Sequence, residues 1–181
     1  CILGIKQEPI AIGNLERYAA DWAAKNIKEE SFDIKPNGIK VAVIGSGPAG
    51  LTCAGDLAKL GYDVTIFESL HDSGGVLRYG IPEFRLPVEV LDREVDSLKK
   101  LGIKFVFNYL IGRTKTVEDL INEGFKAIFV GTGAGLPTFP GVEGENLNNI
   151  YSANEFLVRI NLMNAFQFPE YDTPVHKGKN V

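Results

Sequence analysis

The chain has 181 residues, which suffices for one well-packed domain with appendages but is short for two full ones. Its composition, 45% hydrophobic and 23% charged with a net charge of −4, is typical of a soluble globular protein and gives no sign of a nucleic-acid-binding surface. No apolar run approaches the ~20 residues that cross a membrane, no signal peptide is recognisable, and the two cysteines make no disulfide framework, so we expect a cytoplasmic protein without a membrane partner.

An N-terminal helix and a polar connector are expected before the first strand. Residues 1–12 show no regular pattern, and a helix is predicted to begin with Asn14 as its cap. Its apolar residues recur at helical spacing and would pack against the next domain: Leu15, Tyr18, Ala19, Trp22 and Ala23. Residues 25–38 are polar and predict the connector. Because the chain begins with Cys1 rather than Met, we expect it to be a piece of a longer polypeptide.

A strand, a glycine-rich turn, a helix and a second strand are predicted next, over residues 40–44, 45–50, 48–60 and 63–67. The first strand is almost wholly apolar, as expected of a strand buried on both faces of a parallel sheet. Gly45 permits a tight turn, Gly47 lets the backbone approach a pyrophosphate, and Gly50 lets the helix lie close to the strand. Pro48 suits the first helical turn, whose free N–H groups and dipole favour phosphate.

Glu68 directly follows the second strand and lies 23 residues after Gly45. This spacing is close to the ~20 residues typical of the acid that binds ribose hydroxyls, and a carboxylate there would repel a 2′-phosphate. A glycine motif alone is a weak signal, because such turns also occur for purely steric reasons. Together with the strand, the helix and the acid, it predicts a site for the ADP-ribose part of FAD or NAD rather than NADP.

A long loop and two further strands are predicted beyond this unit. The loop spans residues 69–87, and its apolar residues argue against disorder. An amphipathic helix over residues 88–101 precedes a strand over 103–107. A short helix over 118–122, with Thr116 as its cap, precedes a strand over 127–130.

The last of these strands runs directly into a second glycine cluster, Gly131–Gly135. Ligands bind beyond the carboxyl ends of the strands in an open α/β sheet, so two such clusters would let the backbone approach one long ligand at two points. A purely steric turn remains the alternative for this cluster alone. Residues 153–166 then look helical, and residues 178–181 look like the approach to another strand.

In these features the sequence resembles the glutamate synthase small subunit family of flavoproteins, which includes NADPH-dependent ferredoxin and sulfide oxidoreductases and dihydropyrimidine dehydrogenase. The resemblance covers nearly the whole chain and is carried by Cys1-x-x-Gly4, the run from Pro9 to Arg17, Gly45-Ser-Gly-Pro-Ala-Gly50-Leu51, Gly74-Gly75, Gly80-Ile-Pro82, Phe84-Arg-Leu-Pro87, Val130-Gly-Thr-Gly-Ala-Gly135 and Ser152-Ala-Asn-Glu-Phe-Leu157. It implies an α/β, Rossmann-like FAD-binding domain with a mostly parallel sheet over residues 39–168. The end of an iron–sulfur domain, a helix and a connector would occupy residues 1–38, and a linker toward an NAD(P)H domain residues 169–181.

The resemblance also implies which residues bind the cofactor. FAD would be held by Gly45, Ser46, Gly47, Pro48, Ala49, Gly50, Glu68, Gly75, Val76, Arg85, Ile111, Gly131, Thr132 and Gly133. Cys1 would be the last ligand of an iron–sulfur cluster bound by a preceding domain. The parent enzyme would pass electrons from NAD(P)H through FAD to iron–sulfur centres, with the iron–sulfur and NAD(P)H domains and a large catalytic subunit as partners. No side chain in this chain is expected to be a catalytic acid or base, and the chain alone is expected to be inactive.

Two other functions stay open. An NAD-binding dehydrogenase domain would leave the loop over residues 69–87 and the second glycine cluster unexplained. A non-catalytic nucleotide-binding module would use the apolar loop to bind a partner. The visible absorption of a bound flavin distinguishes FAD binding from both.

Overall fold

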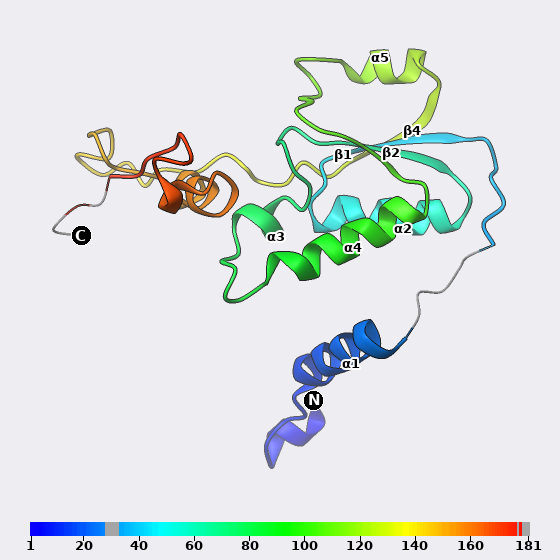
Figure 1. The fold of residues 1–181 in the computed structure, drawn as a ribbon, viewed down its shortest axis with the longest axis horizontal. Helices are drawn as coiled ribbons and strands as arrows, with labels where there is room; N and C mark the ends of the chain where they lie inside the picture. The colour runs from blue at the N-terminus through cyan, green and yellow to red at the C-terminus, as the bar shows by residue number, and fades with distance from the viewer. Residues whose placement is uncertain (28–32, 177, 179–181) are drawn as a thin grey trace. The chain divides into compact units, whose positions relative to one another are not determined.

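The computed structural model describes residues 1–27, 33–176 and 178, and the chain divides into two compact units, Cys1–Asp33 and Ile34–Val181 (Figure 1). In the first unit, a short 3-10 helix (η1, Ile2–Ile5) precedes helix α1 (Ile12–Asn26). The predicted cap at Asn14 is wrong: α1 follows Ala11 without a side-chain cap, and the Asn14 N–H donates to the Ala11 carbonyl inside the first turn. The expected connector lies partly outside the described residues.

The second unit is built on a four-stranded sheet of β1 (Lys40–Ile44), β2 (Asp63–Phe67), β3 (Lys104–Val106) and β4 (Phe125–Val130). The strands lie in the order β3-β2-β1-β4, and every neighbouring pair is parallel. The sequence predicted all four strands, and the parallel, Rossmann-like sheet is confirmed.

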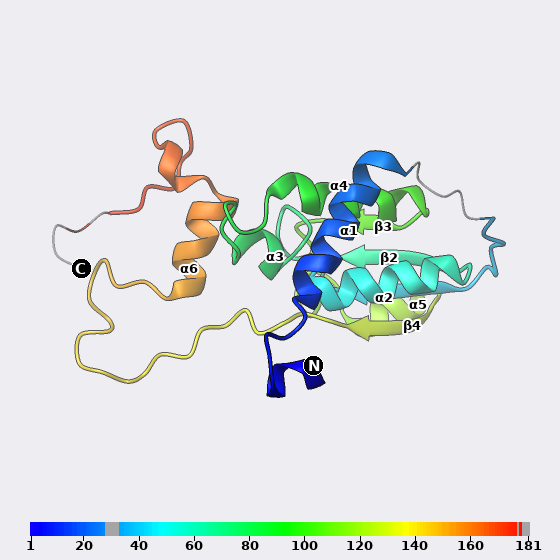
Figure 2. The same cartoon turned by 90° about the horizontal axis from the view of Figure 1, so that it is seen from below.

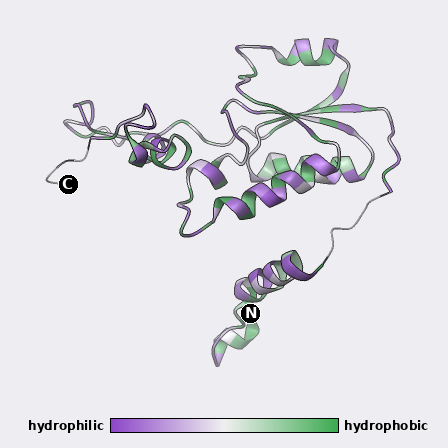
Figure 3. Cartoon of the chain, viewed as in Figure 1, coloured by the Kyte–Doolittle hydropathy of each residue, from purple (hydrophilic) through white to green (hydrophobic). Residues whose placement is uncertain are grey.

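Helices cover both faces of this sheet. Helices α2 (Pro48–Lys59) and α4 (Val88–Lys100) lie on one face, and the short helix α5 (Val117–Asn122) lies on the other (Figure 1, Figure 2). Side chains alternate between the faces along a strand. In β1, Val43 packs with residues of α2 and α4, whereas Ala42 and Ile44 pack with Leu120 of α5. Hydrophilic and hydrophobic residues alternate along helix α4 (Figure 3), and its buried residues are Leu91 and Val95, as its amphipathic sequence predicts.

Two cores result from this arrangement. The core under α2 and α4 contains Val43, Leu51, Ala54, Ala58, Val64, Ile66, Leu91, Val95 and Ile103. The core under α5 is smaller and contains Ala42, Ile44, Phe67 and Leu120. Helix α5 is fixed by a capping box, as Thr116 accepts from the Asp119 N–H at 3.1 Å while the Asp119 carboxylate accepts from the Thr116 N–H at 2.9 Å. The Thr116 N–H and hydroxyl both donate to the Asp119 carboxylate, and these bonds lower the pKa of Asp119.

Two segments differ from their sequence predictions. The loop over residues 69–87 contains a one-turn helix, α3 (Val76–Tyr79). The helix expected over residues 153–166 is three short turns: α6 (Ala153–Leu157), a π-helical turn η2 (Val158–Leu162) and a 3-10 turn η3 (Ala165–Gln167). Asn164 takes the left-handed conformation between the last two turns, and the Asn161 amide donates to the Tyr79 carbonyl at 2.8 Å. This tertiary contact, which helical periodicity cannot reveal, ties η2 to α3.

The end of the chain, where a further strand was expected, lies outside the described residues. None of the helices in the described ranges is long and apolar enough to span a membrane.

The second core predicts a clear stability difference between two neighbouring residues of α5. Leu120 is fully buried in it, whereas Ile121 is 57% exposed. Leu120→Ala should lower the free energy of unfolding by about 2–5 kcal/mol, because it leaves a cavity under a short helix. Ile121→Ala should change it by no more than about 0.5 kcal/mol. Urea denaturation of both variants measures the difference, and equal effects would contradict the packing of α5 on the sheet.

Candidate functional site

The residues that follow β1, β2 and β4 lie together at the carboxyl-terminal end of the sheet. Ile44 lies opposite Phe67 on one side and opposite Val130 on the other, so β1, β2 and β4 end at the same level. The next residues hold the strands together there. The Gly45 N–H donates to the Phe67 carbonyl and the Gly131 N–H to the Ile44 carbonyl, both at 2.8 Å. The two glycine clusters predicted to approach one ligand therefore lie side by side.

Some of these glycines are required by close backbone packing. Gly45 has a φ of +98°, and a Cβ on it would overlap the carbonyl oxygen of Gly131. A Cβ on Gly50 would overlap the carbonyl oxygen of Gly45, at the start of α2. These two positions are thus explained by the fold itself, with no ligand needed.

Packing does not explain Gly47. Its φ is −70° and its ψ −179°, which any residue adopts, and an added Cβ would meet no atom within 4 Å. Gly133 in the second cluster also faces open space, but its φ of +68° by itself favours glycine. Pro48 and Ala49, in the first turn of α2, are exposed beside Gly47. Gly47 therefore leaves a backbone cradle open at the start of a 12-residue helix, where a Cβ would fill the space that a pyrophosphate needs.

A third glycine turn, Gly74–Gly75, closes on the same cradle. The Gly74 N–H donates to the carbonyl of Ser46 at 3.0 Å and to its hydroxyl at 3.2 Å. A Cβ on Gly75 would lie only 2.9 Å from the Gly47 Cα, so the two turns are in direct backbone contact. The following residue, Val76, is exposed at the start of α3. The structure thus brings Gly75 and Val76 to the first glycine turn.

Glu68 is buried at this edge and is saturated with hydrogen bonds. Its Oε2 accepts from the Ser46 N–H at 2.8 Å and from the Ser46 hydroxyl at 2.5 Å. Its Oε1 accepts from the Leu70 N–H at 2.9 Å and from the Ser69 hydroxyl at 3.1 Å. A carboxylate offers about four acceptor positions, so all of them have a protein donor. Glu68 therefore fastens the glycine turn to β2, a role that its spacing from Gly45 did not indicate.

A ribose could reach Glu68 only by replacing one of these donors. Ser69 is exposed, and its hydroxyl makes the longest of the four bonds. The other three donors are the two backbone N–H groups and the hydroxyl of Ser46, which is fully buried. Sequence reasoning missed both serines as partners of Glu68. Ser46 lies 22 residues away in the chain, and adjacency in sequence does not indicate that the Ser69 hydroxyl donates to its neighbour.

The remaining predicted site residues are less closely connected. Ile111 packs against the second core, and in the same segment the Tyr109 N–H donates to the Glu68 carbonyl at 2.8 Å. Arg85 is exposed in a turn closed by its own N–H and the Pro82 carbonyl, and within the described ranges no hydrogen bond joins its side chain to the glycine turns. Thr132 is exposed after β4.

The two cysteines lie in different surroundings. Cys1 is exposed in the first unit, and Cys53 is half-buried in α2, where burial raises the pKa of its thiol. In the part of the chain that the structure describes, no group of three or more His, Cys, Asp or Glu side chains could hold a metal ion. The raised pKa of Cys53 lowers its thiolate fraction, which argues against a reactive thiol.

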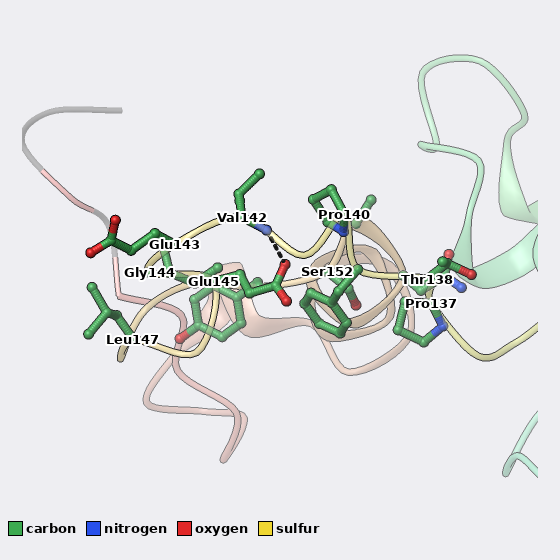
Figure 4. A pocket seen from close by; sticks show the side chains of 14 residues that line it. Pro137, Thr138, Pro140, Val142, Glu143, Gly144, Glu145, Leu147 and Ser152 are labelled. Atoms are coloured by element: carbon green, nitrogen blue, oxygen red, sulfur yellow. Dashed lines mark hydrogen bonds between the residues drawn. The ribbon is translucent and has the colours of Figure 1, made fainter.

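A separate hollow of about 660 Å³ lies in the segment 137–154, after the second glycine cluster (Figure 4). Pro140, Val142 and Leu147 are among its mainly apolar lining residues. The Glu145 carboxylate accepts from the Gly141 and Val142 N–H groups at 2.9 and 3.3 Å, so it closes the loop on itself. None of the predicted site residues lines this hollow.

Curated proteins with similar sequences are oxidoreductases. The chain is 36% identical to the glutamate synthase [NADPH] small chain of Escherichia coli (strain K12) over 159 residues, covering 87% of this chain and 34% of that protein. It is 42% identical to the NAD-dependent dihydropyrimidine dehydrogenase subunit PreT of Escherichia coli (strain K12), covering 72% of this chain and 32% of that protein. The chain thus spans about a third of the length of these relatives.

Solved structures agree in fold. FprA of Mycobacterium tuberculosis, in complex with NADPH, matches 77% of this chain and 31% of its own with a TM-score of 0.60 and 22% identity. A 2-naphthoyl-CoA reductase matches 70% of this chain and 19% of its own with a TM-score of 0.56 and 29% identity. The family model described as pyridine nucleotide-disulphide oxidoreductase matches residues 39–162, well over half of the sequence. This chain is therefore a member of the pyridine nucleotide-disulphide oxidoreductase family, and the resemblance that its motifs predict is confirmed.

Proposed function

We propose that this chain is the FAD-binding part of an NAD(P)H-dependent oxidoreductase that delivers electrons to iron–sulfur centres. The observation that carries the proposal is the open cradle at Gly47, where neither backbone conformation nor packing requires a glycine. A dinucleotide supplies the missing reason, because its pyrophosphate needs unhindered backbone N–H groups at a helix start.

Each predicted residue has a place in this proposal. The backbone from Gly45 to Gly50 holds the pyrophosphate, and Glu68 accepts from the adenosine ribose after the Ser69 hydroxyl turns away. Gly75, Val76 and the turn from Gly131 to Gly133 line the cofactor by backbone. Ile111 packs toward the adenine end, and Arg85 reaches the cofactor from its exposed turn.

The proposal also extends to the parent protein. Bound FAD supplies the exchange between two-electron hydride transfer and one-electron transfer, and this chain's residues bind and orient it. An NAD(P)H domain, a preceding iron–sulfur domain to which Cys1 contributes a ligand, and a large catalytic subunit in the cytoplasm would be its partners. The names of two relatives, a glutamate synthase [NADPH] small chain and an NAD-dependent dihydropyrimidine dehydrogenase subunit, support the use of NAD(P)H and the presence of further subunits.

Direct titration tests the proposed cofactor. The 181-residue chain should take up FAD weakly, with quenching of flavin fluorescence and a shifted visible band, and it should not accelerate NADPH-driven dye reduction above free flavin. Holding the nicotinamide against the flavin contributes many powers of ten to the rate of hydride transfer. We assign this role to the proposed NAD(P)H domain. Binding of NAD with no binding of FAD would favour a dehydrogenase domain, and binding of neither would favour a non-catalytic module.

Gly47→Ala separates cofactor binding from folding. Because its φ is −70° and its surroundings are open, the added methyl group should leave the unfolding free energy within about 0.5 kcal/mol of the unsubstituted chain. FAD uptake should be lost, because the methyl group occupies the pyrophosphate position. Gly50→Ala should instead destabilise the fold, and Gly13→Ala in α1 should affect neither FAD binding nor the sheet. Undiminished FAD affinity in Gly47→Ala would remove the cradle from the site.

The saturated carboxylate predicts opposite effects for two neighbouring residues. Ser69→Ala frees one acceptor position on Glu68, so FAD affinity should rise by about 2- to 10-fold, the equivalent of one hydrogen bond. Glu68→Ala should weaken FAD binding and also lower the unfolding free energy by about 1–3 kcal/mol, because it leaves buried N–H groups without an acceptor.

Ser97→Ala is the matched control for Ser69→Ala, because the Ser97 hydroxyl donates to the Arg93 carbonyl within α4. It should leave FAD affinity unchanged. A Ser69→Ala variant that binds FAD more weakly would show that this hydroxyl holds the cofactor rather than competing with it.

A further inference from the structure

Arg78 lies on α3 with its side chain only 9% exposed, and its guanidinium joins three groups. Its Nε donates to the Ser73 carbonyl at 2.6 Å and lies 3.3 Å from the Asp72 carboxylate. One terminal nitrogen donates to the Asp92 carboxylate of α4 at 2.5 Å. The forked guanidinium of Arg78 therefore connects the loop after β2 to α4, which packs on the sheet.

This fork lies directly beside the Gly74–Gly75 turn. Ser73, whose carbonyl it holds, immediately precedes the turn. Gly74 has a φ of +111° and Gly75 of +53°, so both occupy conformations that L side chains rarely adopt. The turn reaches the cradle through the Gly74 bonds to Ser46 and the contact of Gly75 with Gly47. The position of the turn against Gly47 thus depends on how firmly its flanks are held.

The guanidinium of Arg78 binds carboxylates of the protein itself rather than a ligand. Its guanidinium is buried, and two carboxylates already face it. The carboxylates themselves are 42% and 51% exposed, so they stay hydrated when the cation is removed. Loss of Arg78 would therefore release the turn without leaving two uncompensated charges in the interior.

We propose that Arg78 is a positioning residue for the cofactor: it anchors the Gly74–Gly75 turn to α4, so that the turn stays in contact with Gly47 and lines the pyrophosphate and flavin side. This inference rests on the proposed FAD binding and adds a residue that does not itself touch the ligand. The alternative is a purely structural role, in which Arg78 only stabilises the second unit.

Ligands of two sizes distinguish these roles. AMP retains the adenine, the ribose and one phosphate, whereas FAD extends past the turn. Arg78→Met should weaken FAD binding by roughly 10- to 100-fold, as expected when charge-assisted hydrogen bonds no longer hold the turn, and AMP binding by less than about threefold. Arg78→Lys keeps the charge but lacks the fork, and should fall between Arg78→Met and the unsubstituted chain.

Two further variants keep the test decisive if Arg78→Met folds poorly. Asp92→Asn weakens the anchor from its other end and should reduce FAD affinity in the same direction by a smaller factor. Lys99→Met removes a cation of α4 that pairs with Asp96 at 2.8 Å, away from the turn, and should change nothing. Flavin-fluorescence titration, AMP competition and urea denaturation of each variant supply the readouts.

The outcomes separate cleanly. A selective loss of FAD over AMP, at an unfolding free energy close to that of the unsubstituted chain, supports the positioning role. Equal FAD affinity in Arg78→Met and the unsubstituted chain overturns this inference alone. Parallel losses of FAD, AMP and stability overturn it in favour of a structural role. Failure of the unsubstituted chain to bind FAD overturns the proposed function together with the inference.

Discussion

The contact between the backbones of Gly45 and Gly131 is the constraint on which the rest of the site depends. No side chain fits between them, since a Cβ on Gly45 would overlap the Gly131 carbonyl oxygen. Parallel pairing of β1 with β4 brings the two residues together, and hydrogen bonds at 2.8 Å hold each to the adjacent strand end. A Cβ on Gly50 would in turn overlap the Gly45 carbonyl oxygen, so α2 begins close against this contact, while Gly47 stays open. The cradle is therefore a consequence of sheet register rather than of any single loop.

Polar contacts then link the cradle to its surroundings in one connected path. Glu68 accepts from the Ser46 N–H, and the Ser46 hydroxyl accepts from the Gly74 N–H. The carbonyl of the neighbouring Ser73 accepts from Arg78, which also donates to Asp92 of α4. Buried polar networks are favourable only when their members are satisfied, and in the described part of the chain no buried side-chain nitrogen or oxygen lacks a hydrogen-bond partner. Glu68 fastens the turn, and in the proposed function this role would compete with accepting a hydrogen bond from a ribose. The exposed Ser69 hydroxyl is the one donor whose departure would leave the backbone fastening intact.

Sequence reasoning succeeded where the signal is local and failed where a distant contact decides. The four strands, the helices α2 and α4 and the cap at Thr116 follow from periodicity and capping chemistry. The meeting of the two glycine clusters follows from the rule on strand ends in open α/β sheets. The start of α1 at Ile12 and the break at Asn164 have no such signal. The partnerships of Ser46 with Glu68 and of Arg78 with Asp92 span 22 and 14 residues, and neither periodicity nor a known motif indicates them.

The two halves of the proposed site differ in how firmly the fold supports them. The first glycine turn is fastened to both cores: Ile44 and Leu51 flank it, and its own Ser46 is buried against the Glu68 carboxylate. The second cluster follows the edge strand β4, where Val130 is 64% exposed, and Leu136 beyond it is 91% exposed. Surface that is fixed before binding costs less ordering entropy when a ligand arrives. In the proposed site, a pyrophosphate at Gly47 would therefore meet backbone that is fixed in advance, whereas a ribose would meet Glu68 only after the Ser69 hydroxyl turns away. The proposed contact at Gly133 would involve a segment whose large apolar side chains are exposed, so we expect affinity to come mainly from the adenosine and pyrophosphate half.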